Sequence, residues 1–84
     1  MLKILYLASL RERLQTAQEQ LSLPQAVSTV GQLREFLRTR GADWELALSA
    51  GRNLRVAVDQ EMAEPDTPLR GNEEVAFFPP VTGG

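Results

Sequence analysis

The chain has 84 residues, of which 43% are hydrophobic and 24% charged, and its formal net charge is −2. This length suits one small domain, and no apolar run approaches the roughly 20 residues of a membrane-spanning helix. The lack of cysteine and histidine excludes disulfides, thiolate metal sites and histidine-dependent catalysis, and the absence of a basic patch argues against nucleic acid as a partner.

An apolar segment at residues 2–7 predicts the first strand. Its side chains alternate, so Ile4 and Tyr6 face one side of a sheet while Leu5 and Leu7 face the other. If Ile4 and Tyr6 lie in the core, the other pair faces outward.

Weaker patterns follow this strand. Residues 9–14 predict a short helical turn or a loop. Residues 19–23 predict a second strand, which Pro24 ends because proline has no N–H to donate to a sheet. The length of the connection suggests that the two strands form an antiparallel hairpin.

The main helix is predicted over residues 29–40. Thr29 and Gln32 have the spacing of a capping box, with Thr29 as the N-cap residue. Gly41 stands where a C-terminal glycine cap is common. An apolar stripe at helical spacing opposes a polar face that we expect to meet water. The stripe consists of Val30, Leu33, Phe36 and Leu37, and the polar face of Arg34, Glu35 and Arg38.

A second, shorter helix is predicted to follow Asp43 as its N-cap residue. Trp44, the only tryptophan, is interpreted as a core anchor of this helix, because a ligand-stacking tryptophan would have basic or aromatic company. Residues 50–53 then predict a turn.

Further strands complete the prediction. Residues 54–59 alternate apolar with other side chains, as a half-buried strand does, and a second, very short strand is a candidate near Met62. Residues 75–78 are apolar, aromatic and β-branched, which is typical of a strand. Pro79 and Pro80 end it.

This order of elements predicts an α+β fold of the β-grasp, ubiquitin-like class: a mixed sheet wrapped around one main helix, plus a short second helix. We expect the domain to span residues 1–78, with its first and last strands side by side as a central parallel pair. The alternative is a ferredoxin-like sandwich, which needs two comparably long helices on one face.

A flexible tail is predicted at residues 79–84. In a polyproline-like conformation its six residues reach about 19 Å, at roughly 3.1 Å per residue. Gly83 and Gly84 have no side chain to widen the tether, and Gly84 carries the carboxylate that ends the sequence. Such a tether suits a narrow site in another protein. The alternative is an ordinary frayed chain end.

The run from Val75 to Gly84 resembles the C-terminus of the small, sulfur-carrying subunit of molybdopterin synthase, a ubiquitin-like family. The resemblance implies a non-catalytic carrier. An E1-like enzyme uses ATP to adenylate the Gly84 carboxylate, a sulfur donor displaces AMP, and the resulting thiocarboxylate gives its sulfur to cyclic pyranopterin monophosphate during molybdopterin synthesis.

The resemblance also implies the setting of this chemistry. The large synthase subunit supplies the acid and base residues, and the two kinds of subunit form a heterotetramer in the cytoplasm. We expect the carrier itself to bind no cofactor or metal and to contact neither a membrane nor nucleic acid.

The predicted docking residues are apolar side chains that the core does not use. Burying Val75 and Phe77 leaves Phe78 outside, where it could join Leu7 and Met62 in an exposed patch. The resemblance implies that this patch contacts the large subunit and the activating enzyme; the alternative is that a loop covers it. The tail contributes Pro79, Pro80, Val81 and Thr82 to partner binding, Gly83 as tether and Gly84 as the reactive group.

Other interpretations stay open. The chain could be a ubiquitin-like modifier joined to target lysines, or the sulfur carrier of thiamine thiazole synthesis, although the run at residues 77–82 favours molybdopterin. Asp59, Glu61 and Glu64 are a weak metal-site candidate, which we interpret instead as a solvated acidic loop.

Overall fold

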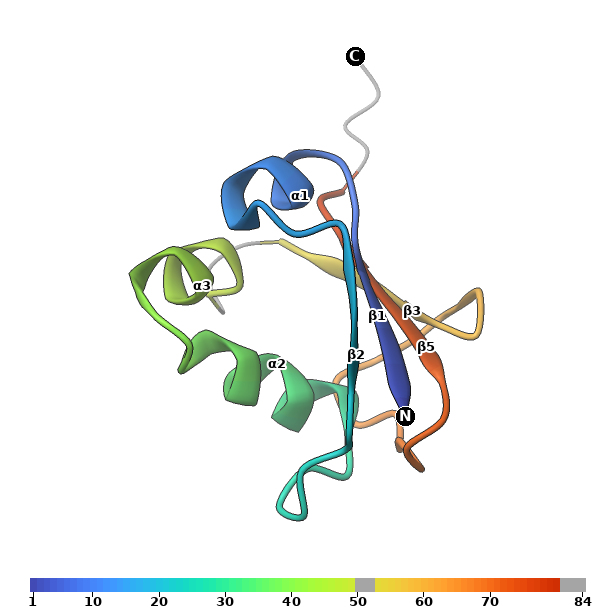
Figure 1. Ribbon diagram of the computed structural model, residues 1–84. Coiled ribbons are helices and arrows are strands. Elements are labelled where there is room, and N and C mark those ends of the chain that lie inside the picture. Colours follow the sequence, from blue (N-terminus) through green and yellow to red (C-terminus); the bar gives the residue numbers. More distant parts are fainter. Residues whose placement is uncertain (50–52, 81–84) are drawn as a thin grey trace.

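The structure is a computed structural model that describes residues 1–49 and 53–80. Five strands form one mixed sheet in the order β2-β1-β5-β3-β4. The helices lie on one side of this sheet, with α2 and α3 along its face and α1 near one end (Figure 1). The elements are β1 (Leu2–Tyr6), α1 (Ser9–Leu14), β2 (Gln18–Leu21), α2 (Val30–Arg38), α3 (Ala42–Ala47), β3 (Arg55–Val58), β4 (Glu61–Met62) and β5 (Glu74–Phe78).

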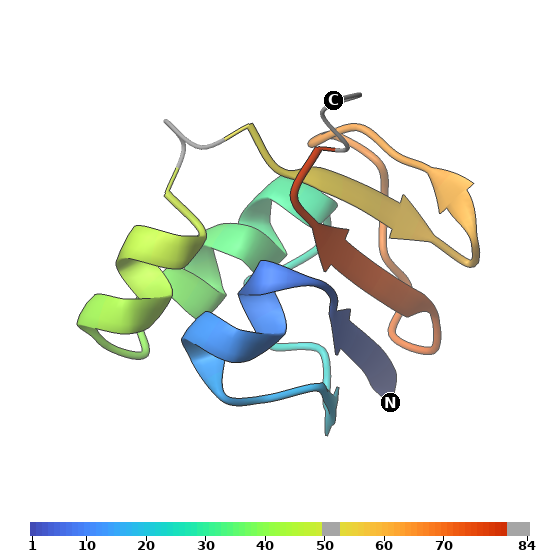
Figure 2. The same cartoon turned by 90° about the horizontal axis from the view of Figure 1, so that it is seen from above.

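The first and last strands form the centre of the sheet, as predicted. Strand β1 pairs with β5 in parallel, with Ile4 opposite Val75 and Tyr6 opposite Phe77. The other edge of β5 pairs with β3 in antiparallel, so β5 is hydrogen-bonded on both sides (Figure 2). Strand β2 extends β1 as the predicted antiparallel hairpin. This mixed sheet with its covering helices confirms the β-grasp prediction.

The core lies between the sheet and α2. Alternate residues of the two central strands face the helix, and its predicted stripe meets them because both patterns place their apolar side chains on one face. The fully buried residues of this layer are Leu2, Ile4, Tyr6, Val75 and Phe77 from the strands, and Leu33 and Leu37 from α2. Each large side chain buried here contributes about 1.5–3 kcal/mol relative to exposure.

Helix α2 begins as predicted but ends earlier. The Thr29 hydroxyl accepts a hydrogen bond from the Gln32 N–H at 3.2 Å, which confirms Thr29 as the N-cap residue. The Gln32 side chain reaches back to the N–H of Ser28, at 2.7 Å, rather than to Thr29. The helix ends at Arg38, so the predicted glycine cap at Gly41 is wrong: the last turn closes before that residue.

The start of α3 and the end of β2 also differ from the sequence prediction. Gly41, with a φ of 150°, is the N-cap residue of α3, so the prediction of Asp43 as N-cap is wrong. Asp43 lies instead in the first turn, where a carboxylate favours the helix dipole. Strand β2 ends at Leu21 instead of Leu23. The predicted turn at residues 50–53 lies outside the described residues except for Asn53.

Arg34 does not face water as predicted. It is half-buried, and its Nε donates to the carbonyl oxygen of Leu48 at 2.7 Å while a second nitrogen donates to that of Ser49. These carbonyls follow α3 and have no helical partner, so Arg34 fastens the end of α3 to α2. Burial lowers the pKa of Arg34 from its ordinary value. Arg38 is also half-buried, whereas Glu35 is exposed.

Candidate functional site: the tail base and the outer face of the sheet

Strand β5 gives the tail a fixed starting point. Phe77 is 1% exposed, and its ring stacks on that of Tyr6, with centroids 6.3 Å apart and an interplanar angle of 11°. Pro79 and Pro80 follow as half-buried residues at the end of the sheet near α1 (Figure 1). The chain therefore leaves the domain from a strand held on both sides and by its core face.

A polar cluster surrounds the Tyr6 hydroxyl of β1, the strand next to β5. The Tyr6 hydroxyl donates to the Glu19 carboxylate at 2.7 Å, and Arg40 donates to both oxygens of the same carboxylate at 2.7 and 2.9 Å. The Arg40 guanidinium lies 4.8 Å from the ring centroid of Trp44. The Trp44 and Tyr6 rings are nearly perpendicular, with centroids 5.4 Å apart. The cluster joins β1, β2 and the segment between α2 and α3.

The prediction for Trp44 is confirmed in part. The side chain packs against the core, as expected of an anchor. The expectation that it lacks basic or aromatic neighbours is wrong, because Arg40 and Tyr6 come to it from distant parts of the chain. The one sequence signal for this cluster is the placement of Tyr6 on the core face of β1, where a buried hydroxyl needs a partner.

The electrostatics of the cluster favour fixed protonation states. Burial, followed by the hydrogen bond to Glu19, raises the pKa of Tyr6 far above its ordinary value. Burial alone would raise the pKa of Glu19, but the hydrogen bonds from Arg40 and Tyr6 outweigh it and hold that pKa below its ordinary value. Tyr6 is thus neutral and Glu19 ionised at neutral pH, and neither is placed to exchange protons with a substrate.

The opposite side of the sheet, here called the outer face, carries the predicted docking residues. Leu7 directly follows β1, is 41% exposed, and donates its N–H to the Phe77 carbonyl at 3.0 Å, which places it beside Phe78. Phe78 is half-buried. Leu7 and Phe78 therefore meet at the end of the sheet from which the tail leaves.

Met62 belongs to the same face but lies farther from the tail. It is 61% exposed and pairs with Ala57 of β3, which in turn pairs with Ala76 of β5. The two alanines therefore bridge Met62 to Phe78 and Leu7. The strand registers place Leu7, Phe78 and Met62 on one face of the sheet, with Met62 away from the tail. That they form a docking patch stays a prediction.

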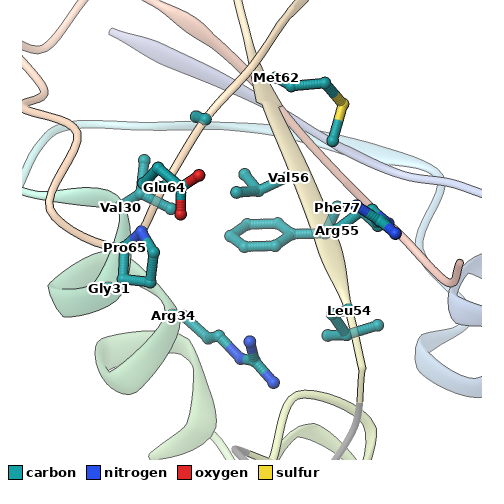
Figure 3. A pocket seen from close by; sticks show the side chains of 11 residues that line it. Val30, Gly31, Arg34, Leu54, Arg55, Val56, Met62, Glu64, Pro65 and Phe77 are labelled. Atoms are coloured by element: carbon teal, nitrogen blue, oxygen red, sulfur yellow. The ribbon is translucent and has the colours of Figure 1, made fainter.

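A cavity of about 320 Å³ lies on the other side of β3, against the start of α2. Figure 3 shows Phe77, Val56 and Pro65 among the residues that line it, and Arg55 and Met62 also belong to its lining. A second cavity, of about 330 Å³, is lined by Pro79 and Pro80 together with residues of α1. The tail base and the docking face thus have hollows beside them, and both hollows share Leu54.

Of the acidic residues considered for a metal site, Asp59 has backbone partners across the sheet. Asp59, at the β3–β4 turn with a φ of 51°, accepts from the Glu74 N–H at 3.0 Å and donates its own N–H to the Glu74 carbonyl at 2.8 Å. Within residues 1–49 and 53–80, no group of three or more acidic residues is placed to hold a metal ion. Nor is any helix in those ranges long and apolar enough to cross a membrane.

Glu73 stabilises the turn before β5. Its carboxylate accepts hydrogen bonds from the N–H groups of Arg70, Gly71 and Asn72 at 2.8, 2.9 and 3.2 Å. Slight burial raises the pKa of Glu73, but these backbone N–H groups outweigh it and lower that pKa. The tail residues Val81, Thr82, Gly83 and Gly84, which the sequence singles out, lie outside the described residues.

Comparison with known proteins gives full-length matches. The model of the ThiS family matches residues 4–84. The molybdopterin synthase sulfur carrier subunits of Escherichia coli K12 and Haemophilus influenzae are 40% and 37% identical to the chain over 84 residues, which is 100% of each protein.

Solved structures share the fold at lower identity. SAMP1 from Haloferax volcanii is 22% identical, with a TM-score of 0.75 over 99% of this chain and 98% of that one. A putative molybdopterin converting factor, subunit 1, from Pyrococcus furiosus is 22% identical, with a TM-score of 0.76 over 95% and 97%. At this identity the likeness concerns the fold alone.

Proposed function

We propose that the chain carries sulfur on Gly84, from the premise that it belongs to the ThiS family and, within it, to the molybdopterin synthase sulfur carrier subunits. A subunit of this synthase has the large subunit as its partner. The observation that supports the proposal most is the position of the Gly-Gly end, six residues beyond a strand that two neighbours and the core hold in place.

The chemistry begins with activation of a poor electrophile. A carboxylate oxygen of Gly84 attacks the α-phosphorus of ATP in an E1-like enzyme, pyrophosphate leaves, and a mixed anhydride with AMP forms. A sulfur donor then displaces AMP and leaves a thiocarboxylate. In the complex with the large subunit, each thiocarboxylate passes its one sulfur to cyclic pyranopterin monophosphate and returns to a carboxylate, so two carriers supply the two sulfurs of the dithiolene of molybdopterin.

The residues of the described domain indicate which groups the partners must supply. The described domain offers no base near the tail: Glu19 is committed to Arg40 and Tyr6, and Glu73 to backbone N–H groups. The acid and base groups, the ATP site and the pterin site therefore belong to the partners. We place the reaction in the cytoplasm, where ATP is available, and assign the synthase a heterotetrameric form.

Docking uses the outer face. Leu7, Met62 and Phe78 contact the large subunit and, at another time, the activating enzyme, while Pro79, Pro80, Val81 and Thr82 line the path of the tail. Burying each large side chain contributes about 1.5–3 kcal/mol before the costs of association. The prolines reduce the entropy lost on threading, because their backbone is already restricted.

Intact-mass measurement tests this function. Wild type, a Gly84 deletion and a one-residue extension are incubated with the activating enzyme, ATP and a sulfur source. We expect only wild type to exchange one oxygen for sulfur. Each variant shifts the carboxylate by about 3.3–3.6 Å, and such misplacement costs on the order of a hundredfold in rate.

Two outcomes contradict the proposal. An extended protein that acquires sulfur as fast as wild type would show that the terminal glycine is not the reacting group. Wild type found in amide linkage to lysines of other proteins would replace the carrier function with that of a modifier.

A further inference from the structure

Arg55 stands at the tail end of the outer face. It begins β3 and lies directly opposite Phe78 in the register of β3 with β5. Opposite residues of neighbouring strands point to the same face with Cβ atoms about 4.5–5.5 Å apart, so the Arg55 side chain accompanies Phe78. It is exposed, and Figure 3 shows it on the other side of β3 from Arg34 and Pro65.

Within residues 1–49 and 53–80, no acidic position of this face lies beside Arg55. The next outer-face positions along β3 and β5 are Ala57 and Ala76, and the first acidic positions are Asp59 and Glu74. These are four residues farther along their strands, about 13 Å at 3.3 Å per residue, and thus beyond the roughly 8 Å over which exposed charges interact at physiological salt. The ion pairs found in the described ranges involve other arginines.

The opposite end of the face is different. There Glu74 lies opposite Lys3 in the register of β1 with β5, so its charge has a neighbour of the other sign. The outer face therefore has an uncompensated cation at the end where the tail leaves and mixed charges at the other end. Between the two ends lie apolar residues, namely Leu5, Ala57, Met62 and Ala76.

We propose that Arg55 is a recognition residue that pairs with a carboxylate on the large synthase subunit, next to the apolar contact made by Leu7 and Phe78; this rests on the proposed function. Apolar contacts are non-directional and permit several rotations of one surface on another. A single charge pair at one end of the contact selects one rotation, because charges across an interface fix its register. The selected rotation is the one that aims the tail into the partner.

Arginine suits this position better than lysine. Its planar guanidinium binds a carboxylate through two parallel hydrogen bonds, and it is less strongly hydrated than an ammonium group. Its apolar stem starts opposite Phe78 in the strand register, so the same side chain adds apolar contact when the partner covers it.

Binding kinetics with the purified large subunit test the pairing. The variants are Arg55→Glu, Arg55→Lys and, as the matched control, Arg70→Glu, an exposed arginine in the loop at the other end of β5 that gives the same change in net charge. We expect Arg55→Glu to lose about tenfold in affinity, mainly through slower association with weaker salt dependence. Arg70→Glu should stay within about twofold of wild type, and Arg55→Lys should fall between them.

The outcomes separate this inference from the proposed function. Equal affinities of Arg55→Glu and Arg70→Glu would overturn it, while failure of wild type to bind the large subunit would count against the function itself. Thermal melts establish that each variant is folded. As a second measurement, Asp→Lys and Glu→Lys substitutions on the large subunit should include one that restores binding of Arg55→Glu; if none restores it, the carboxylate pairing is wrong.

Discussion

The inner and outer faces of the central strands β1 and β5 differ in how far their side chains are buried. On the inner face, Tyr6 and Phe77 are enclosed and stacked on each other, and the Tyr6 hydroxyl donates to Glu19. On the outer face, the next residues along the same strands, Leu7 and Phe78, remain accessible. A shift of one residue along a strand therefore separates side chains that hold the domain together from side chains that are free to meet a partner.

Truncating the inner face should give the largest loss of stability. Phe77→Ala removes a ring that is 1% exposed and stacks on Tyr6, and we expect the free energy of unfolding to fall by about 3–5 kcal/mol. Urea unfolding monitored by circular dichroism measures this. A loss below about 1 kcal/mol would show that the inner face is not the source of stability.

Disrupting the polar cluster should lower the free energy of unfolding by less than Phe77→Ala does. Glu19→Gln removes the negative charge that accepts three hydrogen bonds, and we expect a loss of about 1–2 kcal/mol, because hydrogen bonds to charged groups are strong but this carboxylate is partly screened by water. The unfolding free energies of the two proteins at pH 7 give the value. Thr29→Ala serves as a control, because it removes a helix cap that lies outside the cluster. We expect it to lower the free energy of unfolding by about 1 kcal/mol.

The same cluster predicts a pH dependence. Because folding lowers the pKa of Glu19, its contribution is complete above the ordinary glutamate pKa, about 4.3, and is lost as the pH falls through the lower folded value. The difference in unfolding free energy between wild type and Glu19→Gln should therefore shrink between pH 7 and pH 3. A difference that stays constant over this range would mean that ionised Glu19 is not the stabilising group.

Changing the outer face should have the smallest effect on stability and a clear effect on binding. Phe78→Ala and Leu7→Ser should lower the unfolding free energy by less than about 1 kcal/mol, since these side chains already meet water. Both should weaken binding to the large subunit in calorimetric titrations. A large drop in melting temperature with unchanged binding would reassign these residues to the core.

Local patterns account for the part of the fold that sequence reasoning predicts. Strand alternation identifies the buried set in β1 and β5, and the Thr29 cap with its apolar stripe identifies α2. The contacts of Arg34 and Arg40 were not predictable, because each depends on a partner that only the tertiary structure brings near: the end of α3 for Arg34 and β2 for Arg40. The charge on Arg55 becomes informative only once the register shows what lies beside it.

The parallel pairing of β1 with β5 also bears on how the domain is made. The paired residues, such as Ile4 and Val75, lie about 70 residues apart in sequence, so the central contact closes a loop of nearly the whole chain. Such a topology folds late, and a nascent chain on the ribosome lacks its middle strand until β5 has emerged. A translation product that stops before Phe78 cannot complete its sheet. The central pair of the sheet therefore closes only after β5, the segment that leads into the tail, has been synthesised.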